Sequence, residues 1–115
     1  MRVYVAGKYS DTNIIACLNN IHEGIKMSVD VLKLGHACFC PWLDYQFQFF
    51  SKDLKVEDYY RYSMAWLEVS DCVLVLPGYE TSKGTLAEIK RAEEKGINIY
   101  YKLEDLPTAK KERGL

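Results

Sequence analysis

A carboxylate close to the start of a predicted helix is the residue best suited to chemistry. Ser82 fits the N-cap position of that helix, and Gly84 and Thr85 then lie in its first turn. Glu88 follows one turn later on the same side. Its carboxylate is therefore expected to point over the end of the preceding strand, beside exposed N–H donors.

Two interpretations of Glu88 stay open at this point. It is either one charge on a solvated helix face, paired with Arg91 or with Lys95, or an ionised nucleophile aimed at an electrophilic sugar carbon. The preceding turn, Pro77-Gly78, belongs to the same candidate site because it also follows that strand.

A second candidate segment, Gly7-Lys8-Tyr9-Ser10, leads from a first strand to a helix N-terminus. Free N–H groups and the helix dipole favour an anion at such a place. Gly7 and Lys8 are therefore candidates for contact with a phosphate or a ribose. A simple structural turn with a solvated lysine is the open alternative.

A third candidate segment is a long aromatic connection between Pro41 and about Val56. Its length suggests a lid or a binding segment. We expect Trp42 to stack on a nucleobase, since aromatic faces bind bases and Trp42 lies nearest the end of a strand. The alternating Tyr45, Phe47 and Phe49 are expected to bury one side against this subunit or a neighbour.

The elements that must position these segments follow from hydrophobic periodicity. Short apolar runs predict strands, and apolar residues three and four apart predict amphipathic helices. We expect strands at 3–6, 37–40, 71–76 and 97–101, and helices at 11–35, 57–69 and 83–95, the first capped by Asp11 or Thr12 and ended by Gly35.

This alternation of strands and helices predicts an α/β fold. We expect a three-layer, flavodoxin/Rossmann-like parallel sheet of about four to five strands, with helices on both faces. Residues 71–76 form a continuous apolar run, typical of a strand buried on both faces. Ligands of such sheets bind at the carboxyl ends of the strands, where the three candidate segments begin.

Composition narrows the class of protein. The 115 residues, 49% of them hydrophobic, are enough for one domain spanning 1–115. A net charge of −1 lacks the basic excess that nucleic-acid binding requires. The longest apolar stretch, 37–43, is far shorter than the roughly 18 residues of a membrane span. With no signal-peptide pattern at the start, we expect a cytoplasmic protein with neither nucleic acid nor membrane as a partner.

The cysteines and histidines raise the question of a metal. On a strand, His36, Cys38 and Cys40 would share one face and offer zinc-ligand types. Zinc sites usually pair two such motifs, and the other histidine, His22, lies on a predicted helix without a ligand partner. We therefore expect buried strand cysteines, no disulfide, no metal and no cofactor.

Three separated motifs carry a resemblance to a known family. Val3-Tyr4-Val5-Ala6-Gly7, the run from Ser70 to Gly78, and Gly84-Thr85 with Ala87-Glu88 occur in the right order at the right strand ends. Together they resemble the nucleoside 2-deoxyribosyltransferase superfamily, particularly its short phage and bacterial members. The similarity runs from Val3 to about Tyr101.

The resemblance implies cleavage of the N-glycosidic bond of a (deoxy)nucleoside or nucleoside 5′-monophosphate, by hydrolysis or base transfer. Glu88 matches the nucleophile of that family, and Tyr4 matches the tyrosine that orients it. Gly7 matches the loop that approaches the sugar or its phosphate. The candidate substrate-binding residues are Gly7, Lys8, Trp42, Ser63, Pro77, Gly78, Ser82, Gly84 and Thr85.

One departure from the family pattern concerns the general acid. Many members carry a helix-borne aspartate eight residues before the aspartate that opens the third strand, and here that position is Ser63. A hydroxyl can bind a sugar oxygen but is a poor general acid. Either another carboxylate, such as Asp44, takes the role, or the protein is slow or inactive.

Three other accounts remain open. Leu76-Pro77-Gly78 with Gly84-Thr85 and Glu88 also resembles the motif of the cytokinin-activating phosphoribohydrolases, although five residues intervene between the two glycines. A non-catalytic nucleotide-binding module that has lost the general acid would explain Ser63. A subunit-interaction domain would explain the nine tyrosines.

A short chain with one open pocket predicts assembly into a homodimer or a higher homo-oligomer. Tyr59, Tyr60 and Tyr62 are the candidates for the subunit interface. Light scattering of the purified protein should give at least twice the monomer mass. A strict monomer with full activity would count against this expectation.

Overall fold

The computed structural model describes residues 1–108 and contains one parallel four-stranded sheet. The strand order is β2-β1-β3-β4, so β1 and β3 are the central strands. Tyr4 of β1 pairs with Phe39 of β2 on one side and with Val73 of β3 on the other. The strands are β1 (Arg2–Ala6), β2 (Ala37–Phe39), β3 (Cys72–Val75) and β4 (Asn98–Tyr100).

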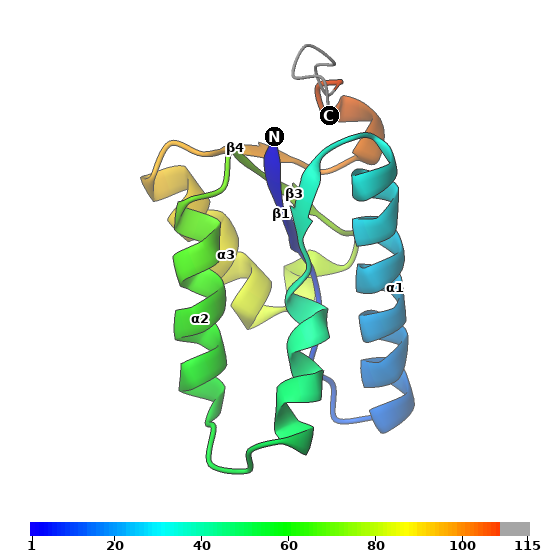
Figure 1. Ribbon diagram of the computed structural model, residues 1–115, viewed down its shortest axis with the longest axis vertical. Coiled ribbons are helices and arrows are strands. Elements are labelled where there is room, and N and C mark those ends of the chain that lie inside the picture. Colours follow the sequence, from blue (N-terminus) through cyan, green and yellow to red (C-terminus); the bar gives the residue numbers. More distant parts are fainter. Residues whose placement is uncertain (109–115) are drawn as a thin grey trace.

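Helices cover both faces of this sheet (Figure 1). Helix α1 lies on one face, and α2 and α3 lie on the other. The predicted three-layer α/β fold is therefore confirmed, with four strands. The helices are α1 (Ile14–Lys33), α2 (Val56–Glu68) and α3 (Lys83–Glu94), with the 3-10 helices η1 (Pro41–Phe49), η2 (Tyr79–Thr81) and η3 (Leu103–Asp105). Across residues 1–108, no helix combines the length and apolar character that a membrane crossing needs.

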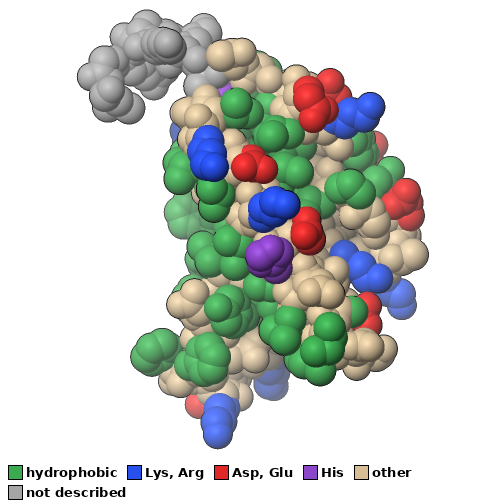
Figure 2. Space-filling model, turned by 90° about the vertical axis from the view of Figure 1, so that its right-hand side faces the viewer, with side chains coloured by type: hydrophobic (Ala, Val, Ile, Leu, Met, Phe, Trp, Pro, Cys, Tyr) green, Lys and Arg blue, Asp and Glu red, His purple; other side chains and the backbone are tan. Residues whose placement is uncertain are grey.

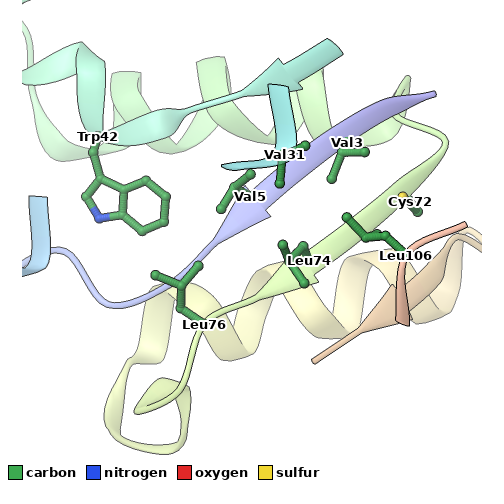
Figure 3. Packing of buried hydrophobic residues seen from close by; sticks show 8 residues of the cluster. All are labelled: Val3, Val5, Val31, Trp42, Cys72, Leu74, Leu76 and Leu106. Atoms are coloured by element: carbon green, nitrogen blue, oxygen red, sulfur yellow. The ribbon is translucent and has the colours of Figure 1, made fainter. Parts of the chain in front are cut away.

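Two hydrophobic cores follow from the alternation of side chains along the central strands. Val3 and Val5 of β1 face α1 and pack with Leu74 and Trp42 (Figure 3). Tyr4 and Ala6 face the other way, toward α2 and α3. All four residues of β3 are buried, as expected for a strand inside a parallel sheet.

The chain connections produce a crevice at the carboxyl ends of β1 and β3. Helix α1 connects β1 to β2 at one edge of the sheet. Helix α3 connects β3 to β4 at the opposite edge. Loops that leave neighbouring strands in opposite directions open a crevice between them, the usual ligand site of such folds.

Two features of α1 differ from the prediction. Asn13, not Asp11 or Thr12, is the N-cap, because its side chain accepts hydrogen bonds from the amides of Ile15 and Ala16. Asp11 instead accepts from the Asn13 amide at 2.9 Å. Gly35 does end the helix region, with a left-handed φ of 93°.

The buried face of α1 also differs from the apolar stripe that predicted the helix. The helix buries Gly24, Ser28 and Val31, small residues that permit close packing on the sheet. Several members of the apolar stripe stay exposed, and Figure 2 shows apolar side chains interspersed with charged ones on this side of the molecule. The exposed apolar residues of the helix are Ile14, Ile15, Leu18, Val29 and Leu32.

The aromatic connection is more ordered than expected, since η1 occupies Pro41–Phe49. Of the two alternatives for Tyr45, Phe47 and Phe49, burial against this subunit does not hold, since Phe47 and Phe49 are exposed, and burial against a neighbouring subunit stays a prediction. With three residues per turn, side chains two apart do not share a face. Phe49 and the following Phe50 are 77% and 91% exposed.

Trp42 joins η1 to the rest of the fold. Its side chain is 1% exposed, packs on Gly24 of α1 and donates from Nε1 to the Lys8 carbonyl oxygen at 3.1 Å. A Cβ at Gly24 would lie 2.0 Å from the indole ring, which no real contact permits. The close approach of α1 and η1 therefore requires glycine here.

Gly24→Ala should destabilise the protein by about 2 kcal/mol, because overpacking a core costs roughly 1–3 kcal/mol. A helical glycine with room for a Cβ behaves oppositely, and the protein gains roughly 0.5–1 kcal/mol of stability when alanine replaces it. Gly84→Ala is the matched control, since its Cβ would meet only an ordinary contact at 3.6 Å with Tyr60. Urea unfolding measures both, and a Gly24→Ala protein as stable as the wild type would contradict the packing argument.

Candidate active site

A cleft of about 770 Å³ opens at the carboxyl ends of the strands. Its walls come from the loop after β1, from η1 and the segment that follows it, from the first half of α2, and from α3 with its N-cap. The cleft brings together the predicted residues Gly7, Asp44, Ser63, Gly84, Thr85 and Glu88. Segments that are far apart in the sequence thus form one site, at the crevice between β1 and β3.

Tyr4 and Glu88 form a hydrogen-bonded pair beside this cleft. Tyr4 is fully buried on β1, and its hydroxyl donates to Oε2 of Glu88, which lines the cleft from α3. Ile89, the next residue of α3, packs in the same core as Tyr4 and fixes the helix against the sheet. The strand and the helix therefore bring these two side chains together.

The environment of this pair alters both acidities. Burial raises the pKa of Glu88 from 4.5 to about 7, and the hydrogen bond from Tyr4 opposes that rise. Burial also raises the pKa of Tyr4, and the neighbouring Glu88 carboxylate raises it further. Tyr4 therefore remains a hydrogen-bond donor, and Glu88 changes its charge near neutral pH.

The alternative in which Glu88 is one charge on a solvated helix face does not fit this geometry. Arg91, the neighbour proposed for that pairing, binds Glu68 of α2 with an N–O distance of 2.6 Å. Glu88 is instead partly buried and hydrogen-bonded to a fully buried tyrosine. A buried carboxylate that faces a cleft can act as a nucleophile or exchange a proton.

Hydroxyl groups surround the pair. Ser63 of α2 is buried and lines the cleft, and its hydrogen bond to Tyr4 lowers the pKa of that tyrosine, opposing the rise from burial. Ser82 is the N-cap of α3, as expected, since its Oγ accepts from the Thr85 amide at 3.2 Å. The Ser82 and Thr85 hydroxyls lie 2.8 Å apart, which fixes the first turn of α3 under the cleft.

Tyr9 and Asp44 form a second tyrosine–carboxylate pair in the same cleft. The Tyr9 hydroxyl donates to Asp44 Oδ1 at 2.8 Å. Burial raises the pKa of Asp44, and the Tyr9 hydrogen bond lowers it in part. Sequence reasoning treated Tyr9 only as part of a loop. The signal available was a tyrosine placed, like Tyr4, where a central strand brings it toward the ligand edge.

Other predicted residues lie elsewhere. The Lys8 amine pairs with Asp11 at 3.7 Å, and its side chain does not line the cleft. Pro77 and Gly78 form an exposed turn outside the cleft lining. Trp42 touches the cleft, but its 1% exposure leaves no open ring face for a base, so its role here is to hold the first loop.

The tyrosines proposed for a subunit interface divide between two places. Tyr59 and Tyr60 line the cleft. Tyr62 contacts Phe39 and Phe47 beside the edge strand β2, with ring centroids 5.9 and 5.8 Å apart. Of these three tyrosines, only Tyr62 lies away from the cleft.

The histidine considered as a zinc ligand has other partners. His36 is buried, its Nδ1 lies 3.1 Å from the N-terminal amine, and its Nε2 lies 2.8 Å from the Pro107 carbonyl oxygen. Within the described residues, no three His, Cys, Asp or Glu side chains gather as a metal ion would need.

Comparisons with known proteins agree with the fold. A family described as Domain of unknown function (DUF4406) matches residues 1–101. A solved 2-deoxyribosyltransferase from Bacillus psychrosaccharolyticus superposes with a TM-score of 0.65 and 14% sequence identity, over 86% of this chain and 69% of that one. No curated protein matches in sequence. At this identity, the structural similarity to the 2-deoxyribosyltransferase shows a shared fold only.

The stability of the protein should depend on pH through Glu88. Its pKa is higher in the folded protein, about 7, than the ordinary 4.5, so the folded state holds this proton more tightly. The free energy of unfolding should therefore fall as pH rises from about 4.5 to about 7 and then level off. Glu88→Gln should exceed the wild type in stability at pH 8 by about 1–3 kcal/mol, at about 1.4 kcal/mol per pKa unit, and match it near pH 4.

Urea unfolding at pH 4, 6 and 8 measures this difference. Tyr4→Phe should extend the fall to higher pH, because it removes the hydrogen bond that lowers the pKa of Glu88. Glu94→Gln, an exposed change on the same helix, is the control and should follow the wild type. Parallel pH profiles for wild type and Glu88→Gln would rule out the raised pKa.

Proposed function

The chain belongs to the DUF4406 family, and we propose that it cleaves the N-glycosidic bond of a nucleoside or nucleoside 5′-monophosphate with Glu88 as the nucleophile. The observation that carries this proposal is the Tyr4–Glu88 pair beside a cleft at the ends of the central strands. The shared fold with a 2-deoxyribosyltransferase, a protein described for nucleoside synthesis, supports it.

In the first step, a Glu88 oxygen attacks the anomeric carbon of the sugar. The new C–O bond forms as the C–N bond breaks, and the electron pair of the C–N bond leaves with the base. Tyr4 binds Oε2, which holds the carboxylate in one orientation for the attack. A covalent glycosyl ester and a free base result.

In the second step, water or another base attacks the same carbon, and the bond to Glu88 breaks. Attack by water is hydrolysis and releases the sugar, whereas attack by a base is transfer and makes a new nucleoside. In both cases the attacking group loses a proton to a base in the cleft, and Glu88 returns as a carboxylate.

Asp44 is the group we assign to the proton transfers. It lines the cleft, and burial raises the pKa of its carboxyl, which is the direction that favours a general acid. Asp44 protonates the departing base in the first step and accepts a proton in the second. Ser63, next to Tyr4, is assigned to a hydrogen bond with a sugar oxygen.

A second candidate function is binding of a nucleotide without catalysis. The observation that favours it is Ser63, a hydroxyl beside the Tyr4–Glu88 pair at the position where the resembled family often has an aspartate. On this account the cleft would hold a nucleotide, and Asp44 would be a binding group. The two candidates differ in whether the glycosidic bond breaks.

Base release should depend on Glu88. The wild type, incubated with deoxynucleosides, ribonucleosides and their 5′-monophosphates, should release free base, followed by chromatography. Glu88→Gln should lose about 1,000-fold or more in rate, as removal of a nucleophile does. Glu94→Gln, on the exposed side of α3, should keep the wild-type rate. The rate should rise with pH through about 7, because the nucleophile must be ionised.

The remaining outcomes separate the candidates. A second base in the mixture should yield a new nucleoside if the reaction is transfer. Thermal stabilisation by a nucleotide, with no base release from any substrate, would favour the binding module. If no substrate gives either base release or thermal stabilisation, both candidate functions are overturned.

A further inference from the structure

One tyrosine in the wall of the cleft has a hydroxyl that the described residues leave without a partner. The Tyr59 hydroxyl is buried, and among residues 1–108 it has no hydrogen-bond partner. Tyr59 lines the cleft and is near enough to Tyr9 to influence the pKa of that residue. Buried hydroxyls in native proteins nearly always have partners, because an unpaired one is unfavourable. A bound molecule would supply the missing partner.

The neighbouring Tyr9–Asp44 pair has one carboxylate oxygen engaged and the other open. Asp44 Oδ1 accepts the hydrogen bond from Tyr9, while Oδ2 accepts none from the described part of the chain. When Asp44 is protonated, a donor on Oδ1 leaves Oδ2 to carry the proton. Tyr9 therefore determines which oxygen presents the proton to the cleft.

The loop that carries Tyr9 is held from two sides. The Asn20 side chain donates to the Tyr9 carbonyl oxygen at 3.2 Å, and the Trp42 indole donates to the Lys8 carbonyl oxygen at 3.1 Å. These contacts attach the loop to α1 and to η1. A tyrosine on so constrained a backbone can orient a carboxylate precisely enough for proton transfer.

We propose that Tyr9, Asp44 and Tyr59 form the subsite for the departing nucleobase, in which Tyr9 positions Asp44 and the Tyr59 hydroxyl hydrogen-bonds the base. This proposal rests on the proposed function of the cleft and adds to it the residues that recognise the base. The ligand is a heteroaromatic ring with a nitrogen that takes a proton and a polar edge that meets a hydroxyl.

The proton on Asp44 Oδ2 passes to a ring nitrogen of the base, while the electron pair of the C–N bond moves onto the base. The Glu88 oxygen forms the new bond to the sugar carbon. Tyr9 keeps its own proton throughout, so it is a positioning residue.

Tyr9→Phe should change the pH profile of base release. Its hydrogen bond lowers the pKa of Asp44, so its loss should raise that pKa and move the alkaline limb of the rate profile to higher pH. Other titratable or charged groups lie around this pair, and the wild type and the Tyr9→Phe protein both contain them. Tyr4, Cys17, Cys40 and Tyr59 interact electrostatically with Tyr9 or Asp44. Lys52, Tyr60, Lys83 and Glu88 line the same cleft.

The rate should also fall, since Asp44 loses its orientation. We expect kcat for Tyr9→Phe to drop about 10- to 100-fold with little change in KM. In an Asp44→Asn background the same change should have almost no further effect, because Tyr9 acts through Asp44. Tyr45→Phe, which lies on η1 and outside the cleft lining, is the matched control. An unshifted alkaline limb, or fully additive losses, would overturn the positioning role.

Tyr59→Phe tests base recognition. We expect KM to rise about 10-fold and kcat to change less, since the hydroxyl binds the ring before and after cleavage. Direct binding gives a second measurement. Adenine, guanine, hypoxanthine, cytosine, uracil and thymine are titrated calorimetrically into the wild type, Glu88→Gln and Tyr59→Phe proteins. At least one base should bind the wild type and Glu88→Gln with about equal affinity. Its affinity for Tyr59→Phe should be about 10-fold lower.

The two readouts separate this inference from the proposed function. Base release by the wild type, with unchanged KM and unchanged base binding in Tyr59→Phe, overturns the subsite and leaves the function standing. If no substrate loses its base in the wild type, the function fails, and binding alone decides the subsite. In that case, weaker binding of a base to Tyr59→Phe than to the wild type supports the subsite. If no base binds the wild type, the subsite is overturned.

Discussion

The buried phenol of Tyr4 is the constraint on which the site depends. Strand β1 has neighbours on both sides and cores on both faces, so Tyr4 has no access to water. A buried hydroxyl requires a partner, and Glu88 of α3 provides it. The same contact keeps the carboxylate at the base of the cleft, where burial makes its charge unfavourable. The orientation of Glu88 and the burial that raises its pKa therefore both depend on this contact.

The two tyrosine–carboxylate pairs have the same chemistry but different surroundings. Tyr4 lies within the sheet, whereas Tyr9 lies in a loop held by Asn20 and Trp42. In both pairs burial raises the carboxyl pKa and the tyrosine lowers it. Two carboxyl groups in one cleft, each adjusted separately by its own tyrosine, are a common basis for dividing acid and nucleophile roles between similar side chains.

The sequence predicts the parts of this molecule that local periodicity governs. Apolar runs locate the strands, and the order of elements implies the sheet and the edge at which Glu88 is found. Other features depend on contacts between distant segments, which periodicity does not encode. The alternating aromatics after Pro41 predict a connection with one buried side, but the segment forms a 3-10 helix. The indole of Trp42, expected to stack on a base, packs against Gly24 instead. Tyr9 becomes recognisable only when η1 brings Asp44 beside it.

The separation of the two halves of the site along the chain bears on how the protein is made. Tyr4 and Glu88 are 84 residues apart, and β1 pairs with β3 across a similar distance. A ribosome adds about 5–20 residues per second, so β1 waits roughly 4 to 17 s for the partners that bury it. During that time its apolar side chains are available to chaperones or to other nascent chains. Because β1 is made well before α3, correct assembly of the site depends on protection of this strand during that interval.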